Sequence, residues 1–194
     1  MDKMMLQKWL AAGYLEKGQL YATEYGVPQG GTISPTLLNI TLSSLENAVK
    51  SATKRSDRVN VIVYADDFII TGKTKEVLEN TVKPVVENFL RERGLVLSQE
   101  KTKITHIQEG FDFLGVNTRK YRNGKLIQKP AKKSVKKFLR NIRETVKKNQ
   151  TAKTENLIRL LNPKIRGWAN YYCHYCSKRT FEYIDNLSPI MAMG

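Results

Sequence analysis

The sequence predicts an α+β fold in which an antiparallel sheet, with helices on one face, is followed by a purely helical region. Short β-branched and alternating apolar runs occur before residue 129. From residue 130 onward, apolar residues recur at three- and four-residue spacing, which is typical of amphipathic helices. Because the pattern changes near Lys129 and Pro130, we expect two domains, residues 1–128 and 129–194.

Positive charge is concentrated in the second half of the chain. Residues 1–98 carry 12 Lys or Arg and 11 Asp or Glu, whereas residues 99–194 carry 21 and 7. This asymmetry indicates a polyanionic partner, most often nucleic acid, with an acidic membrane surface as the alternative. No run approaches the roughly 18 apolar residues of a membrane span, and no signal-peptide pattern opens the chain. We therefore expect a cytoplasmic protein without a membrane partner.

The first elements are predicted from spacing and from helix-start signals. Residues 3–12 have a helical pattern, and residues 20–27 read as a short extended or loop segment. Ser34 is a suitable N-cap, and Pro35 sits at the first helical position, where its missing N–H costs nothing. The helix that follows presents an apolar stripe made of Leu38, Leu42, Leu45 and Val49.

Two β-rich runs, Val59–Val63 and Phe68–Gly72, flank the tetrapeptide Tyr64–Asp67 and predict a β-hairpin. Its tight turn carries two adjacent carboxylates, Asp66 and Asp67. Hard oxygen ligands suit Mg²⁺, and two-metal phosphoryl or nucleotidyl transfer requires such carboxylates. Asp-Asp pairs are also common in ordinary surface turns, so this motif alone leaves both interpretations open.

The next region alternates helix and strand signals. Residues 74–93 have a helical pattern that ends at Gly94, and Pro84 inside it predicts either a kink or two shorter helices. Asn123-Gly124 predicts a hairpin with a type I′ turn. Strands are expected near residues 95–98, 103–107 and 111–116, and on both sides of the Asn123-Gly124 turn.

Beyond Pro130, apolar stripes predict three helices, the third opened by Pro163, and a last short helix near residues 180–187. The first stripe runs from Val135 to Val146, and the opposite face is basic. Such a face suits a phosphate backbone, although charge runs more commonly mark a solvated helix surface. The basic residues are Lys132, Lys133, Lys136, Lys137, Arg140, Arg143 and Lys147.

The two cysteines, Cys173 and Cys176, form one Cys-x-x-Cys with His174 between them. A structural zinc site usually needs four ligands, and the only other histidine is His106. We therefore interpret the pair as two cysteines on a helix face, one turn apart.

Five segments, taken in their order along the chain, resemble the motifs of reverse transcriptases encoded by group II introns. The resemblance covers about residues 3–187. The matching segments are Gly26–Pro35 (the palm motif that lines the nucleotide pocket), Tyr64–Asp67 (the catalytic turn), Gly94–Lys103 (the next palm motif), Phe111–Gly115 (the primer-grip strand) and Pro163–Tyr172 (the maturase thumb signature).

The resemblance implies a partial polymerase palm over residues 1–128 and a truncated thumb, or maturase domain, over residues 129–194. It also implies an RNA-directed DNA polymerase that adds deoxynucleotides by two-metal nucleotidyl transfer, with Mg²⁺ as cofactor. The implied partners are intron RNA, an RNA–DNA duplex and deoxynucleoside triphosphates. The expected location is cytoplasmic, within a ribonucleoprotein.

The resemblance also assigns roles to single residues. Asp66 would be the firmer metal ligand, and Asp67 would complete or orient the site. Lys101 would protonate or neutralise the departing pyrophosphate, with an ordinary solvated loop lysine as the equal alternative. Arg166 would join the basic residues in nucleic-acid binding. The nucleotide-binding residues would be Pro28, Gln29, Gly30, Tyr64 and Ala65. The primer terminus would be supported by Phe113, Leu114 and Gly115. Strand alternation puts Phe111 and Phe113 on one face, so core packing accounts equally well for these rings.

Two parts of the family's active site have no counterpart in the sequence: a third carboxylate and the fingers. Asp2, Glu16 and Glu24 are expected in helix or loop rather than in the strand that the third carboxylate requires. We therefore expect little polymerase activity from the chain alone, and we consider a complementary fingers and palm fragment, or a second copy, as a further partner. Two alternatives stay open: a non-catalytic RNA-binding maturase that assists splicing, and an inactive relic of a mobile element.

Overall fold

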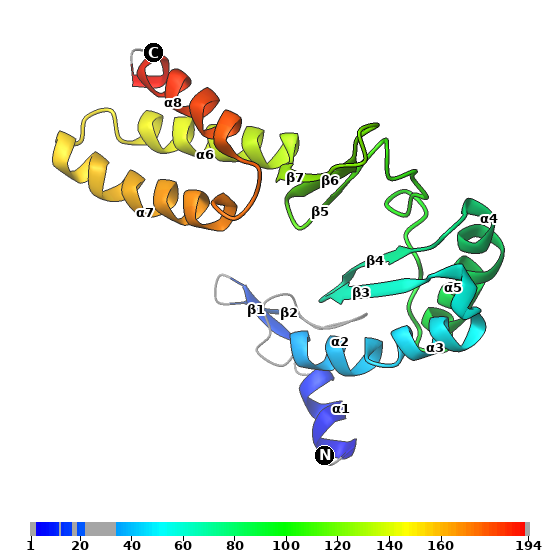
Figure 1. The fold of residues 1–194 in the computed structure, drawn as a ribbon. Helices are drawn as coiled ribbons and strands as arrows, with labels where there is room; N and C mark the ends of the chain where they lie inside the picture. The colour runs from blue at the N-terminus through cyan, green and yellow to red at the C-terminus, as the bar shows by residue number, and fades with distance from the viewer. Residues whose placement is uncertain (1–2, 12, 17–18, 22–33, 193–194) are drawn as a thin grey trace. The chain divides into compact units, whose positions relative to one another are not determined.

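The computed structural model describes residues 3–11, 13–16, 19–21 and 34–192 (Figure 1). The chain packs as two compact units, Met1–Ile104 and Thr105–Gly194, which we call the first and second unit. The strands form three separate antiparallel sheets of two, two and three strands in these ranges. Helices and small antiparallel sheets together confirm the predicted α+β class.

The first unit opens with α1 (Lys3–Ala11) and a short hairpin of β1 (Tyr14–Glu16) and β2 (Gln19–Tyr21). The predicted first helix is therefore confirmed. Glu16 was expected in helix or loop, which is wrong, because its backbone pairs with that of Gln19 across the hairpin.

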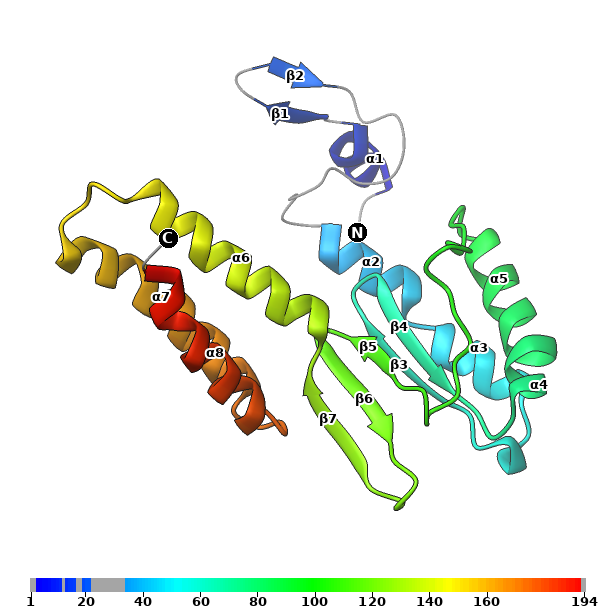
Figure 2. The same cartoon turned by 90° about the horizontal axis from the view of Figure 1, so that it is seen from above.

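The core of the first unit is aliphatic and lies between helices and one face of a hairpin. The helices are α2 (Ser34–Leu42) and α3 (Leu45–Ala52), and the hairpin is formed by β3 (Asn60–Tyr64) and β4 (Asp67–Thr71), after the 3₁₀ turn η1 (Arg55–Asp57). Figure 2 shows α3 on one side of this hairpin. The buried cluster contains Leu42, Leu45, Val49, Val82, Val86, Phe89 and Leu90, which confirms the predicted stripe.

The interruption predicted near Pro84 takes the form of a change of helix type. A short α4 (Lys75–Val77) continues into the π-helical turn η2 (Leu78–Val82), and then into α5 (Lys83–Arg91). The wider turn ends at Val82, two residues before Pro84, which has no backbone N–H to donate to the hydrogen-bond ladder. Gly94 ends the segment with φ 69°, as predicted.

The strands predicted at residues 95–98 and 103–107 are wrong. Leu95 and Leu97 pack against the core of the first unit, but no neighbouring strand pairs with this segment in the described structure. A strand needs a partner for its backbone N–H and C=O groups. The chain instead turns at Ser98, whose carbonyl accepts from the N–H of Thr102, and at His106, whose carbonyl accepts from Gly110.

The second unit begins with the sheet of β5 (Phe111–Phe113), β6 (Val116–Lys120) and β7 (Leu126–Pro130). A turn at Leu114-Gly115 splits the strand predicted over residues 111–116 into β5 and the start of β6. The hairpin at Asn123-Gly124 is confirmed, but its type I′ geometry is wrong. Only Gly124 has a positive φ, and the N–H of Tyr121 donates to Lys125, so the connection is longer than two residues.

Three helices complete the second unit: α6 (Lys132–Lys148), α7 (Thr154–Tyr172) and α8 (Lys178–Ala192), which lie beside one another in Figures 1 and 2. The helix boundary predicted at Pro163 is wrong, because α7 continues through it. Contacts with α6 hold α7 on the C-terminal side of the proline: Lys164 donates to Asn141, and Trp168 stacks on Phe138. None of the helices described here is long and apolar enough to cross a bilayer.

Candidate metal and nucleic-acid sites

The tip of the β3–β4 hairpin presents the two adjacent carboxylates. Tyr64 pairs with Asp67 across the strands, and Ala65 and Asp66 form the connecting turn. Ala65 has φ 51°, a left-handed conformation that a non-glycine residue adopts only when its surroundings impose it. This turn holds Asp66 at the end of a rigid two-stranded support.

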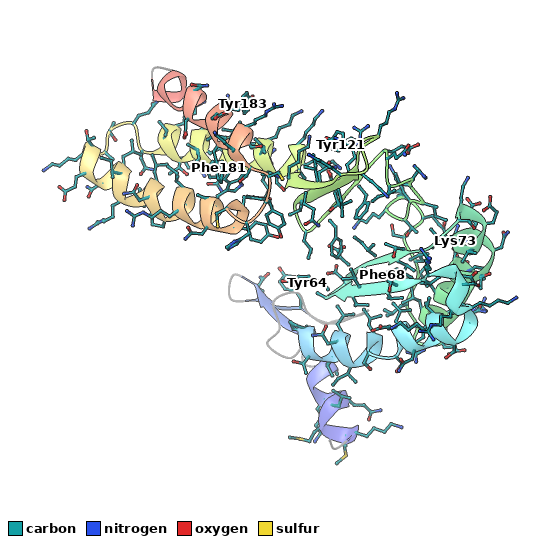
Figure 3. All side chains as sticks on the ribbon, in the orientation of Figure 1. Tyr64, Phe68, Lys73, Tyr121, Phe181 and Tyr183 are labelled. Carbon is teal, nitrogen blue, oxygen red and sulfur yellow. The ribbon has the colours of Figure 1, made fainter. Side chains whose placement is uncertain are left out.

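Strand alternation places Tyr64 and Asp67 away from the core. Val63 and Phe68 form the preceding cross-strand pair and pack against the aliphatic cluster. Successive side chains of a strand point to opposite faces, so Tyr64 and Asp67 share the open face of the hairpin. Tyr64 is 61% exposed, and both aspartates are exposed (Figure 3 labels Tyr64 and Phe68).

The two carboxylates have the chemistry of Mg²⁺ ligands. Neither Asp66 nor Asp67 receives a side-chain hydrogen bond or ion pair from a described residue, whereas Asp57 accepts from the backbone N–H of Lys54 at 3.0 Å. Free, exposed carboxylate oxygens are the ligands that Mg²⁺ prefers. No group of three or more potential ligands gathers among the described residues, so the hairpin provides two donors and leaves the site open.

Lys101 lies in the same unit, in a turn between Ser98 and Thr102. The backbone N–H of Thr102 donates to Ser98 at 2.9 Å and closes this turn, and the Lys101 side chain is exposed. No hydrogen bond or ion pair in the described part joins Lys101 to Asp66 or Asp67. The predicted nucleotide-pocket residues Pro28, Gln29 and Gly30 lie outside the described residues.

The predicted primer-grip turn is held by two tyrosine hydroxyl groups of α7. Tyr171 donates to the carbonyl of Leu114 at 2.7 Å, and Tyr172 donates to the carbonyl of Gly115 at 2.9 Å. The N–H of Ala131 also donates to Gly115, at 2.8 Å. The end of the thumb-signature helix is therefore bonded directly to the turn between β5 and β6.

Glycine is required in this turn for two reasons. Gly115 has φ 79°, and a Cβ at this position would lie 2.7 Å from the Tyr172 hydroxyl and 3.0 Å from the Ser134 hydroxyl. A side chain would therefore be strained and would displace the hydroxyl that binds the turn. Sequence reasoning missed the two tyrosine hydrogen bonds, since their partners lie 57 positions away in the chain.

An aromatic cluster forms the core beneath this turn. Trp168 stacks on Phe138 with ring centroids 4.7 Å apart, and it contacts Tyr172 at 4.6 Å and Phe181 at 5.7 Å. Tyr172 is only 4% exposed. Trp168 and Tyr172 therefore pack in the core of the second unit.

The exposed face of α6 forms a basic groove with α8. The groove has a volume of about 540 Å³. All the predicted basic residues of α6, and Arg166 on α7, are exposed, but Lys132, Lys147 and Arg166 do not line the groove. The lining residues, which we call the basic groove, are Lys133, Lys136, Lys137, Leu139, Arg140, Arg143 and Tyr183.

The cations of the basic groove have no acidic partner within the described ranges. Every ion pair found there lies in the first unit: Glu46–Lys50, Lys75–Glu79, Lys83–Glu87 and Arg93–Glu92. Unpaired cations at helical spacing can contact successive phosphates of a nucleic-acid strand. Tyr183 was missed by sequence reasoning because it enters the groove from another helix.

The cysteine pair does not share a helix face, which corrects the prediction. Cys173 follows the last residue of α7, and Cys176 lies in the connection to α8, where its N–H donates to the carbonyl of Gln128 at 2.9 Å. Both thiols are free and exposed.

Comparison with known proteins places both units among intron-encoded proteins. Residues 1–118 match the family model described as reverse transcriptase (RNA-dependent DNA polymerase), and residues 135–188 match the group II intron, maturase-specific domain. The chain is 34% identical over 143 residues to Protein YkfC of Escherichia coli, an alignment that covers 57% of this chain. It is 24% identical over 255 residues to the Group II intron-encoded protein LtrA of Lactococcus lactis, covering 87% of this chain.

A putative COX1/OXI3 intron 2 protein of Saccharomyces cerevisiae is 26% identical over 173 residues, which is 59% of this chain and 20% of that protein. The alignments cover 37% of YkfC and 43% of LtrA. The chain therefore corresponds to less than half the length of these relatives.

Proposed function

Since this chain belongs to the group II intron-encoded reverse transcriptases and maturases, we propose that its second unit binds intron RNA and that its first unit supplies two carboxylates for nucleotidyl transfer. The observation that carries the proposal is the basic groove, whose cations face no acid among the described residues. The functional domains proposed are a partial palm, residues 1–128, and a thumb or maturase domain, residues 129–194.

RNA binding follows from the electrostatics of α6. Lys132, Lys136, Arg140, Arg143 and Lys147 recur at three- and four-residue spacing along one helix and are exposed. Binding through such residues releases counterions from the RNA, so affinity should fall steeply as salt rises and should depend little on sequence. An RNA–DNA duplex carries the same phosphate charge and is a second proposed partner.

Nucleotidyl transfer joins the primer 3′ oxygen to the α-phosphorus of a deoxynucleoside triphosphate and releases pyrophosphate. Asp66 and Asp67 would hold Mg²⁺, which stabilises charge on the attacking and leaving oxygens. Tyr64 and Ala65 would lie beside the nucleotide, and exposed Lys101 would donate a proton to the pyrophosphate. The turn of Phe113, Leu114 and Gly115 would orient the primer end, held in place by the α7 tyrosines.

Metal binding can be tested separately from catalysis. Mn²⁺ added to the isotope-labelled chain should broaden the amide NMR signals of Asp66 and Asp67, and Mg²⁺ should compete with this effect. The double variant Asp66→Asn and Asp67→Asn should abolish the broadening, whereas Glu79→Gln, which changes an exposed carboxylate elsewhere in the first unit, should not. Equal broadening in the double variant would contradict the metal assignment.

Catalysis is tested by primer extension on an RNA template with Mg²⁺. The chain alone should extend the primer little. Extension by the chain together with a separately supplied fingers fragment should be lost in Asp66→Ala and kept in Glu79→Gln. Extension that survives Asp66→Ala would overturn the catalytic role.

A second candidate function is that of a non-catalytic maturase, favoured by the presence of only two clustered carboxylates in the described residues. In that case, splicing of the cognate intron would be accelerated by the chain, and equally by Asp66→Ala. Lys136→Ala combined with Arg140→Ala would remove the acceleration. No change in splicing rate on adding the protein would exclude this candidate.

A further inference from the structure

Tyr183 is exposed beside a set of unpaired cations. It projects from α8, is 54% exposed, and lines the basic groove together with five cations of α6 (Figure 3). It makes no hydrogen bond or ring contact with another described residue. Leu139 is the other uncharged side chain in the lining, and it is largely buried.

Packing does not explain this ring. Phe181, two residues earlier on the same helix, reaches the core and meets Trp168 edge to face at 5.7 Å. Tyr183 instead leaves more than half its surface in water, beside Lys136 and Arg140 rather than beside the aromatic cluster. A large exposed aromatic side chain among cations is the usual composition of a surface that binds unpaired bases.

The charges around the ring favour an anionic strand. Lys133, Lys136, Lys137, Arg140 and Arg143 all line the groove, and none pairs with Glu144 of α6 or Glu182 of α8. The volume of about 540 Å³ is in the range of roughly 300–1,000 Å³ that is usual for sites binding small ligands. The groove is therefore large enough for a nucleotide, and its cations are placed to bind the adjoining phosphates.

We propose that the basic groove binds an unpaired stretch of RNA, with one base stacked on Tyr183 and the neighbouring phosphates held by the cations of α6. Bases inside a duplex are stacked on each other and do not offer a free face, so the groove distinguishes single strands from duplexes. This inference rests on the proposed RNA binding and adds to it a stacking residue and the kind of RNA that is recognised.

The test compares three fluorescein-labelled probes of equal length by anisotropy with the full chain: a single-stranded oligouridylate, the same strand with abasic residues, and an RNA duplex. Stacking on an aromatic side chain is worth enough that Tyr183→Ala should weaken oligouridylate binding by about fivefold to 150-fold. Binding of the abasic strand and of the duplex should change by less than about twofold, because neither offers a free base.

Three control variants separate stacking from other effects. Tyr183→Phe keeps the ring and should bind oligouridylate like the parent chain. Ile158→Ala removes an exposed apolar side chain of α7 outside the groove and should have no effect on any probe. Lys136→Ala with Arg140→Ala should weaken all three probes, because each carries phosphates. Circular dichroism melting should show that all variants fold.

The outcomes distinguish the inference from the function on which it rests. If Tyr183→Ala changes no probe, or all three equally, while the double cation variant weakens them all, the stacking site is refuted and RNA binding by α6 stands. If the double cation variant also leaves every affinity unchanged, the proposed RNA binding itself is refuted.

Discussion

The two units differ most in how they use charge. The first unit, residues 1–104, carries 14 Lys or Arg and 12 Asp or Glu, and its described ion pairs join helix neighbours such as Glu46 and Lys50. The second unit, residues 105–194, carries 19 Lys or Arg and 6 Asp or Glu, and its described residues form no ion pair. Exposed ion pairs contribute little stability, so the second unit loses little by leaving its cations free.

Unpaired charge therefore indicates the sign of the expected partner. In the first unit, the free charges that lie together at the hairpin tip are the carboxylates of Asp66 and Asp67, which suit a cation. In the second unit, the free charges are the cations of the basic groove, which suit a phosphate backbone. Paired residues such as Lys75 and Glu79 neutralise each other and present no net charge to a partner.

The cores of the two units also differ in polarity. The first unit buries aliphatic side chains around Leu45 and Val49, which need no polar partner. The second unit buries aromatic rings and hydroxyl groups: Tyr172 binds the carbonyl of Gly115, and Ser177 binds that of Tyr172. The packing of the second unit therefore depends on specific hydrogen bonds. Loss of the bond from Tyr172 to Gly115 should loosen the primer-grip turn.

The largest expected effect is on the aliphatic core. Leu45→Ala removes a fully buried side chain and should lower the free energy of unfolding of the first unit by about 2–5 kcal/mol. Hydrogen exchange during urea unfolding should show lost protection in the first unit only. Leu126→Ala, which truncates an exposed side chain of β7, is the control. Equal loss of protection in both units would show that they unfold together, and would contradict the view that each unit is stabilised by its own core.

The next effect concerns backbone geometry in the second unit. Gly115→Ala introduces strain at φ 79° and a clash with the Tyr172 hydroxyl, and should cost about 1–3 kcal/mol of unfolding free energy. Gly124→Ala is the matched control, because Gly124 has φ 81° and nothing lies within 4 Å of the added Cβ. Chemical denaturation should therefore show a larger loss at Gly115. Equal losses would mean that the hydroxyl contact contributes nothing.

Removing free cations should affect RNA affinity rather than stability. Lys136→Ala with Arg140→Ala should weaken RNA binding about tenfold or more, and should reduce the slope of log affinity against log salt by about two. Lys50→Ala with Lys75→Ala removes the same charge from paired positions in the first unit and should change the slope little. Anisotropy titrations at several salt concentrations measure both slopes. Similar slopes for the two double variants would contradict the distinction between free and paired charge.

A smaller effect is expected from the hydroxyl that binds the turn. Tyr172→Phe keeps the ring but leaves the carbonyl of Gly115 without this donor, and should cost about 1 kcal/mol. Tyr171→Phe, at a residue 48% exposed, should cost less because water can replace its hydroxyl. Thermal unfolding would rank the two variants, and the reverse order would contradict this account of the turn.

The smallest effect is a pH dependence in the first unit. The pKa of the Glu76 carboxyl is lowered by a hydrogen bond from its own backbone N–H and by a second one from the Thr74 hydroxyl, at the start of α4. A lowered folded-state pKa stabilises the fold above the unfolded-state pKa, and this stabilisation is lost as the pH falls through the folded-state value. In Glu76→Gln, the free energy of unfolding should therefore fall slightly less steeply as the pH is lowered into the acid range. A carboxyl NMR titration giving an ordinary pKa for Glu76 would contradict it.

Local patterns predicted much of the architecture, and the reasons are local. Four features follow from side-chain periodicity or from backbone chemistry within a few residues. They are the β3–β4 hairpin, the apolar stripe of α2 and α3, the interruption near Pro84 and the amphipathic α6. The same motifs, in this order, were enough to identify the family. The adjacent carboxylates at the hairpin tip were likewise visible in the sequence.

Tertiary packing decided what depended on distant partners. Residues 95–98 form an apolar run that suits a strand, but no strand among the described residues pairs with them. Helix α7 continues through Pro163, and its residue Lys164 is held by Asn141 of α6. The tyrosine hydrogen bonds to the primer-grip turn and the position of Tyr183 beside the cations of α6 also join distant segments. The sequence alone determined the periodic elements, the family and the uneven charge, because each depends only on the order of residues along the chain. Only the structure determined which groups are paired and which are free, because pairing is made by contacts across the fold.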